Sequence, residues 1–306
     1  LKSAQVFDYL KHASDYGLTI SEFDKDFSAV VGRSRDVAEG MSKGVQFLMK
    51  KNKIDVILGY GTLLAGKKVS VKTEEGTTEY SADHIIIATG ARSRELPNIP
   101  QDGKKVIGYR QAMTLPTQPK SMIVVGSGAI GVEFAHFYNS MGTDVTIVEY
   151  MPLIVPVEDE DISKQMEKSM KKAGVKIMTS ASVESIDTTG EGVKATVKTA
   201  KGEVVIEADI LLSAVGIKTN IENIGLEDVG IATDRDKILV NEFYQTNIPG
   251  YYAIGDIVAG QALAHVASAE GIACVEKIAG LAVDAIDYGN VPGCTYATPE
   301  IASVGL

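Results

Sequence analysis

The chain has 306 residues, which is enough to bury a sizeable core and suggests about two domains. Its formal net charge of −10 argues against nucleic acid or an anionic membrane as a partner, and no apolar run approaches the length of a membrane span. The two cysteines and four histidines fit no metal-ligand spacing, so we expect no metal site, and cysteines without a disulfide pattern favour a cytoplasmic location.

The N-terminal part is predicted to hold two helices and a strand. Residues 1–22 carry apolar residues at helical spacing, which ends at Tyr16-Gly17, and a second helical pattern runs from residue 27 to residue 52. The apolar run 54–58 predicts a strand, and the glycines of 59–61 predict a turn after it.

An internal repeat joins residues 68–94 to residues 194–220, which align without a gap and share nine identical residues. Each copy predicts a hairpin that turns at Gly76 or Gly202, then a buried strand that ends in a small-residue turn at Gly90 or Gly216. A repeat this far apart indicates two similar domains and not a solenoid. The alternative is coincidence between two hairpins, which the gapless match disfavours.

Residues 121–149 carry the pattern of a dinucleotide-binding unit. A short apolar strand leads into Gly126-Ser-Gly-Ala-Ile-Gly131, a helix follows up to Gly142, and a second strand at 145–148 ends in Glu149. The glycines permit a tight turn, the approach of a pyrophosphate and close packing of the helix, whose N-terminus attracts phosphate. An ordinary glycine-rich turn is the alternative. The residues predicted to bind NAD here are Gly126, Gly128, Ala129, Ile130, Gly131 and Glu149.

Glu149 favours NAD over NADP. An acid at this place accepts hydrogen bonds from the adenine ribose and repels a 2′-phosphate. No lysine or arginine follows it before Lys164.

Two more helices are predicted in the second half of the chain. One begins at the acidic run 157–161, whose charges complement the helix dipole and need no metal to explain them. The other runs from about 264 to 279, after a strand that ends in Gly255-Asp256, and holds Cys274 in the core. Their inward-facing residues are predicted to be Ile162, Met166 and Met170 in the first helix and Ile272, Val275 and Ile278 in the second.

In their order and spacing, these motifs resemble the flavin-dependent pyridine nucleotide–disulfide oxidoreductases. The resemblance covers essentially the whole chain, and the segments 2–12 and 42–52 are similar to the dihydrolipoamide dehydrogenase branch of that family. The motifs that carry it are Ala88-Thr-Gly90, the glycine motif with Glu133, Glu149, Tyr252-Ala-Ile-Gly-Asp256, Leu263-Ala-His265 and Tyr296-Ala-Thr-Pro-Glu300.

The resemblance implies an α/β fold of two Rossmann-like domains, which bind FAD and NAD and each carry a three-stranded β-meander. The NAD domain, at 118–242, would be inserted in an FAD domain made of 1–117 and 243–291, and 292–306 would begin an interface domain. The family's N-terminal glycine motif and its C-x-x-x-x-C redox disulfide do not occur in this sequence. The chain is therefore expected to be a piece of a longer protein.

The resemblance also implies roles for single residues. Asp256 would bind the ribityl chain of FAD, and the helix that begins near His265 would aim its N-terminus at the flavin. Glu133 would support catalysis at the junction of nicotinamide and flavin. Val183 and Gly216 would contact NAD. The other residues expected beside FAD are Gly61, Ala88, Thr89, Gly90, Leu263 and Ala264.

The implied activity is hydride transfer between NAD and FAD with electron exchange to a dithiol, as in the oxidation of dihydrolipoamide by NAD⁺. The implied partners are a small dithiol or the lipoyl domain of a 2-oxo acid dehydrogenase complex, and a second copy of the chain where the interface domain is present. The alternatives are another NADH-dependent disulfide reductase, an NADH oxidase, or a non-catalytic NAD-binding module. The Asp256 motif argues against the last, because a pure NAD binder needs no flavin site.

Overall fold

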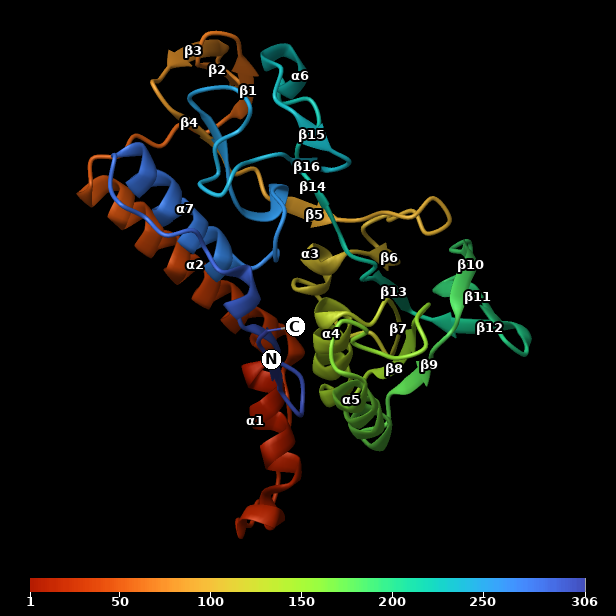
Figure 1. The fold of residues 1–306 in the computed structure, drawn as a ribbon. Coiled ribbons are helices and arrows are strands. Elements are labelled where there is room, and N and C mark those ends of the chain that lie inside the picture. Colours follow the sequence, from red (N-terminus) through yellow and green to blue (C-terminus); the bar gives the residue numbers. More distant parts are fainter. Residues whose placement is uncertain (306) are drawn as a thin grey trace. The chain divides into compact units, whose positions relative to one another are not determined.

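The computed structural model describes residues 1–305, which form two compact units of mixed α/β structure (Figure 1). Unit 1 consists of Leu1–Gly44, Ser93–Gly216 and Pro292–Ser303, and unit 2 of Val45–Arg92, Ile217–Val291, Val304 and Gly305. The predicted α/β class is confirmed. The predicted cofactor-domain boundaries stay a prediction; residues 217–242, expected in the NAD domain, group with unit 2.

The centre of unit 1 is a five-stranded parallel sheet in the order β6-β13-β7-β8-β9. Its strands are β6 (Val106–Ile107), β7 (Ser121–Val125), β8 (Asp144–Val148), β9 (Lys176–Met178) and β13 (Ile210–Ser213). The helices α3 (Tyr109–Ala112), α4 (Ala129–Ser140) and α5 (Glu160–Lys172) belong to the same unit. So does the antiparallel meander of β10 (Ser182–Asp187), β11 (Val193–Thr199) and β12 (Gly202–Ala208).

Both faces of the parallel sheet are buried, and β7 shows how. Met122 and Val124 pack into the cluster that includes residues of α4 and α5, whereas Ile123 and Val125 pack into the cluster formed with the meander. Successive side chains of a strand point to opposite faces, so a continuous apolar run is what a strand covered on both sides requires. The predicted buried strand is therefore confirmed.

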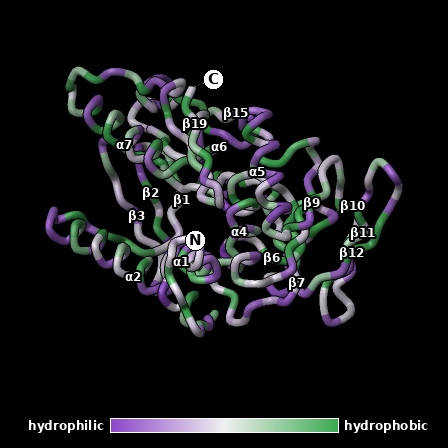
Figure 2. Tube along the Cα trace, turned by 90° about the horizontal axis from the view of Figure 1, so that it is seen from below, coloured by the Kyte–Doolittle hydropathy of each residue, from purple (hydrophilic) through white to green (hydrophobic). Residues whose placement is uncertain are grey.

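Unit 1 also contains α1 (Lys2–Lys11), the short 3-10 helix η1 (Ala13–Tyr16) and the hairpin of β18 (Gly293–Thr295) and β19 (Ile301–Ser303). The helix α2 (Phe27–Lys51) begins at its predicted residue and ends one residue before its predicted end, and none of its residues is buried. Its residues up to Gly44 belong to unit 1, and those from Val45 belong to unit 2. Hydrophilic and hydrophobic residues are mixed along its length (Figure 2).

Unit 2 combines a second three-stranded meander with a parallel pair of strands. The meander consists of β1 (Tyr60–Leu64), β2 (Lys68–Lys72) and β3 (Thr77–Ser81), and the parallel pair of β4 (Ile85–Ile87) and β17 (Tyr251–Ala253). Two further strand pairs are β5 (Ala91–Ser93) with β14 (Ile217–Thr219) and β15 (Thr233–Asp234) with β16 (Lys237–Ile238). The helical elements are α6 (Leu226–Val229), η2 (Gly255–Ile257), α7 (Ala264–Ile278) and η3 (Tyr288–Asn290).

The internal repeat is confirmed down to single hydrogen bonds. The elements β2 to β5 and β11 to β14 occupy equivalent positions of the two copies. In the first hairpin the Thr73 hydroxyl donates to the Gly76 carbonyl, and in the second the Thr199 hydroxyl donates to the Gly202 carbonyl. The same turn chemistry therefore closes both hairpins.

Three local predictions are wrong. Residues 54–58 form no strand, because a strand needs a hydrogen-bonded neighbour and no strand within 1–305 pairs with them. Gly61 lies inside β1, opposite Val71, and not in a turn. Ile162 is exposed, because the buried stripe of α5 runs beside it through Ser163, Met166 and Met170.

The inward face of α7 also differs from its prediction. Ile278 packs against the core as predicted, but Ile272 and Val275 are 61% and 52% exposed. The buried residues of the helix are Val266, Glu270, Ala273 and Cys274. Apolar periodicity favours the face with the larger aliphatic side chains, but this helix turns a carboxylate inward. Cys274 is fully buried as predicted.

Among residues 1–305, no helix combines the length and the hydrophobicity that spanning a membrane would take. No cluster of metal-binding side chains is found in the same range.

Candidate cofactor sites

The glycine motif joins β7 to α4, and each of its three glycines has a different surrounding. A Cβ on Gly126, whose φ is +94°, would lie 2.5 Å from the carbonyl oxygen of Ala214. A Cβ on Gly131 would lie 2.1 Å from the carbonyl oxygen of Gly126. A Cβ on Gly128 would have no atom within 4 Å. The outer glycines are therefore required by packing, whereas the middle one borders open space.

This open space lies at the start of α4. Gly128 is the N-cap of α4, and because glycine has no side chain it cannot cap the first helix residues, Ala129 and Ile130. A helix N-terminus favours anions through its free N–H groups and its dipole. The residues present thus fit the pyrophosphate of a dinucleotide.

Glu149 follows β8 and is only 6% exposed. Its Oε2 accepts the Ser127 backbone N–H at 2.7 Å and the Ser127 hydroxyl at 2.6 Å, and its Oε1 accepts the Met151 N–H at 2.7 Å. A carboxylate offers about four acceptor positions, so one is left for a ribose hydroxyl. Glu149 therefore also holds the glycine loop in place. The role of Ser127 was not predicted, because a serine in this loop shows no sequence pattern that assigns it a partner.

Gly216 and Val183 lie in the same unit as the glycine motif. Gly216 has a φ of +103° and follows β13, the strand that pairs with β7. The side chain of Val183 packs into the same core cluster as Val125 and Val148. Contact of either residue with NAD stays a prediction.

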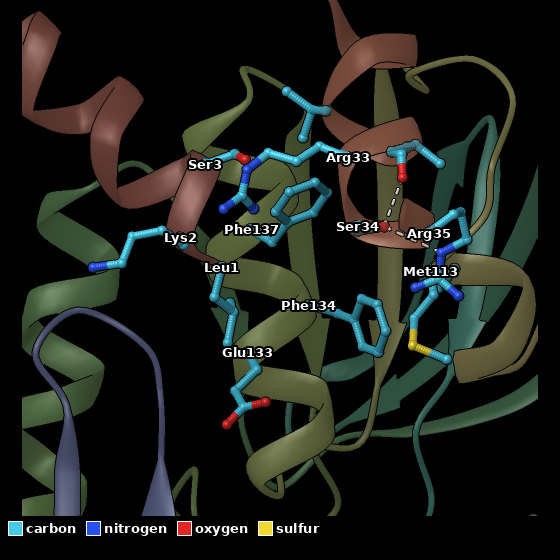
Figure 3. A pocket seen from close by; sticks show the side chains of 13 residues that line it. Leu1, Lys2, Ser3, Arg33, Ser34, Arg35, Met113, Glu133, Phe134 and Phe137 are labelled. Atoms are coloured by element: carbon cyan, nitrogen blue, oxygen red, sulfur yellow. Dashed lines mark hydrogen bonds between the residues drawn. The ribbon is translucent and has the colours of Figure 1, made fainter. Parts of the chain in front are cut away.

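Glu133 lies one turn into α4, where its Oε1 accepts the backbone N–H of Tyr296 at 2.8 Å. Two of the motifs that carry the family resemblance are thus in contact. Glu133 also lines a cavity of about 330 Å³ with Arg33, Phe134 and Phe137 (Figure 3). Most residues that line this cavity are apolar, and the charged ones are Lys2, Arg33, Arg35 and Glu133.

In unit 2, a cavity of about 350 Å³ brings Gly61 and Thr89 together. The backbone N–H of Asn220 donates to the Gly90 carbonyl at 2.9 Å, and its Nδ2 donates to the Thr89 carbonyl at 3.0 Å. Arg92 donates in turn to Asn220 Oδ1 at 2.8 Å. The 88–90 turn, in which Ala88 is exposed and Gly90 has a φ of +66°, is therefore held by Asn220, which no sequence motif marked as part of the site.

Asp256 lies in η2, directly after Gly255, whose φ is +75°. The ammonium group of Lys237 donates to the carbonyl of Asp256. Helix α7 begins nearby in the same unit at Ala264, with Leu263 as an N-cap that makes no side-chain cap and His265 exposed. A left-handed glycine, an acid and a helix start whose N-cap, Leu263, makes no side-chain cap fit a flavin site. The contact of each residue with FAD stays a prediction.

Comparison with known proteins finds relatives over the whole length of the chain. The chain is 49% identical to a dihydrolipoyl dehydrogenase of Rhizobium etli and 43% identical to one of Zymomonas mobilis, in each case over its whole length. It covers 67% and 66% of those two proteins, so it spans about two thirds of the length of these relatives.

Two solved structures are similar as well. A crystal structure of LpdA from Mycobacterium tuberculosis has a TM-score of 0.92 at 30% identity. The match covers 100% of this chain and 67% of the LpdA chain. The flavoprotein disulfide reductase RclA of Escherichia coli, solved as a Cu(II) complex of a cysteine-to-serine mutant, has a TM-score of 0.82 at 27% identity, with 91% of this chain and 63% of RclA covered. The family described as pyridine nucleotide-disulphide oxidoreductase matches residues 8–271. The predicted resemblance is confirmed, and the chain belongs to the pyridine nucleotide-disulphide oxidoreductase family.

Proposed function

We propose that the protein is a dihydrolipoamide dehydrogenase, which oxidises a dihydrolipoyl dithiol with NAD⁺. FAD and NAD are the cofactors of its family. The observation that supports the proposal best is that a chain similar throughout to dihydrolipoyl dehydrogenases contains both constellations, the glycine loop with Glu149 and the Gly255-Asp256 turn with the start of α7.

In this reaction the dithiol loses two electrons and two protons and closes an S–S bond, NAD⁺ takes up a hydride, and one proton is released. FAD, when bound, carries the two electrons between the two half-reactions. The residues of unit 1 would hold the pyrophosphate and ribose of NAD, and Asp256 would hold the ribityl chain of FAD. Glu133 would lie beside the reacting rings as a supporting residue.

Neither cysteine of this sequence suits the thiol half-reaction. Burial raises the pKa of the Cys274 thiol to about 11, which keeps it protonated and a poor nucleophile. Cys294 is exposed, but it lies 20 residues after Cys274, so the two do not form a C-x-x-x-x-C pair. The exchange with lipoamide is therefore not assigned to either.

The partner, the assembly and the compartment are part of the same proposal. A lipoyl domain of a 2-oxo acid dehydrogenase complex is the partner that this activity would serve, with a homodimer as the assembly and the cytoplasm as the compartment. Another NADH-dependent disulfide reductase is the second candidate, because the similarity to RclA extends over most of the chain. An NADH oxidase and a non-catalytic NAD-binding module are weaker alternatives.

The proposed activity is tested with the purified full-length protein. We expect a visible flavin absorption band that NADH bleaches without oxygen, and NADH formation from NAD⁺ with dihydrolipoamide but not with reduced glutathione. A flavin that NADH bleaches, with no turnover of dihydrolipoamide, would favour the other reductases. A protein that binds NADH but no flavin would favour the NAD-binding module.

Coenzyme choice tests the placement of the adenine ribose at Glu149. Tyr150 follows Glu149 and is 77% exposed, so its replacement should not disturb the core. We expect Tyr150→Arg to lower the Kd for NADPH by about tenfold, since a hydrogen bond to a charged group contributes roughly 1.5 kcal/mol or more. The Kd for NADH should stay within about twofold. Tyr150→Leu is the control without a charge, and equal NADPH affinities of the two variants would place the ribose elsewhere.

A further inference from the structure

A buried carboxylate that the proposed function does not use lies in the middle of α7. Glu270 is 1% exposed and shares the buried face of the helix with Val266, Ala273 and Cys274. A carboxylate in such a place is unfavourable unless hydrogen-bond donors surround it. Its partners therefore indicate why it is inside.

Both carboxylate oxygens of Glu270 accept short hydrogen bonds. Oε2 accepts the backbone N–H of Gly255 at 2.6 Å, and Oε1 accepts the Tyr288 hydroxyl at 2.6 Å. The Tyr288 hydroxyl lies 3.1 Å from the hydroxyl of Tyr244. Burial and the bond to Glu270 raise the pKa of Tyr288, so its hydroxyl remains a donor at neutral pH. Tyr288 thereby holds the carboxylate against the turn at Gly255.

That turn carries the acid expected to bind the flavin. Gly255 is in the left-handed region, and a Cβ on it would lie 3.3 Å from the Cβ of Ala267 on α7. The next residue is Asp256, whose carbonyl accepts the ammonium group of Lys237. The turn is thus fixed by Glu270 at the Gly255 N–H and by Lys237 at the Asp256 carbonyl.

We propose that Glu270 is a positioning residue for FAD: by accepting the Gly255 N–H, and braced by Tyr288, it fixes the conformation in which Asp256 binds the ribityl chain. This inference rests on the proposed function and deepens its flavin site. A merely space-filling residue would be apolar here, since a well-packed apolar side chain avoids the desolvation of a charge. Ile272 and Val275, which could fill such a space, are instead on the exposed face of the same helix.

The test uses the full-length protein, freed of flavin and titrated with FAD. We expect Glu270→Ala to raise the Kd for FAD by about tenfold or more, because the turn loses a charge-assisted hydrogen bond. Glu270→Gln should restore most of the affinity, since its amide oxygen accepts the Gly255 N–H and its NH₂ group donates to Tyr288. Tyr288→Phe should raise the Kd by a smaller factor, about threefold. Glu276→Ala, an exposed glutamate on the same helix, is the matched control and should equal the wild type.

The visible spectrum of the bound flavin and the thermal midpoint without FAD are recorded for each variant. A lower midpoint in Glu270→Ala with an unchanged Kd would overturn the inference, because it would show a structural role alone. Glu270→Gln that binds as weakly as Glu270→Ala would also overturn it. If Glu270→Ala does not fold, Tyr288→Phe takes its place in the test. An unchanged Kd for FAD and an unchanged flavin spectrum in Tyr288→Phe would then overturn the inference.

The failure of the flavin site itself has a different signature. A wild-type protein without affinity for FAD would refute the proposed function and this inference together. If the wild type binds FAD and Asp256→Asn has the same Kd for FAD, Asp256 does not belong to the site. Glu270 would then lack the role inferred for it.

Discussion

Replacing Gly128 with valine should raise the Kd for NADH by about 100-fold or more and leave the fold of unit 1 intact. Gly128 has an extended backbone, so valine is allowed there, and a Cβ would meet no protein atom within 4 Å. The same side chain would occupy the space in which the pyrophosphate approaches the start of α4. The loss of two hydrogen bonds to a charged group, each worth about 1.5 kcal/mol or more, corresponds to that factor.

The effect of Gly128→Val on stability should be small. Glycine is a moderately good N-cap, so its loss costs about 1 kcal/mol or less in the free energy of unfolding. NADH binding is measured by the change in nicotinamide fluorescence, and unfolding by circular dichroism. Gly190→Val is the control, because Gly190 lies exposed in unit 1 and its Cβ would also meet nothing within 4 Å. Wild-type affinity of Gly128→Val would show that the dinucleotide does not cross this loop.

The glycine loop was predictable because its constraints are local. Three glycines, a buried strand and a helix follow one another within one short segment, and the structure gives the first and third glycines a physical reason in packing. The repeat was predictable for the same reason, since each hairpin is closed by a threonine and a glycine three residues apart.

The supports of the sites were not predictable, because they come from residues far away in the sequence. Asn220 holds the Thr89-Gly90 turn, and Tyr288 reaches Glu270 from a separate 3-10 helix. No periodic pattern marks such contacts, which join one side chain to one backbone group. In α7 the pattern placed Ile272 and Val275 inward although both are exposed, because it counts aliphatic residues and treats Glu270 as exposed. The segment 54–58 failed in a related way, since composition favours a strand but only a neighbouring strand makes one.

Alanine in place of Gly131 should destabilise unit 1 by about 3 kcal/mol or more, which is the upper part of the range for overpacking. The backbone of Gly131 is helical, so its conformation suits alanine, and α4 would gain helix propensity from the change. The loss comes from one contact alone: the new Cβ would lie 2.1 Å from the carbonyl oxygen of Gly126. Because the Gly126 carbonyl is a backbone group, it cannot rotate aside as a flexible side chain does, so α4 must move away from β7.

Gly32→Ala separates this contact from the general effect of removing a helical glycine. Gly32 lies in α2, and its Cβ would meet nothing within 4 Å, so alanine should leave stability unchanged or increase it by up to about 1 kcal/mol. Both variants are compared by chemical denaturation of the protein without cofactors. Equal stabilities would mean that α4 does not lie close on β7 in solution. If Gly131→Ala is destabilised while Gly128→Val keeps its stability and loses affinity for NADH, the third glycine is assigned to packing and the second to the ligand.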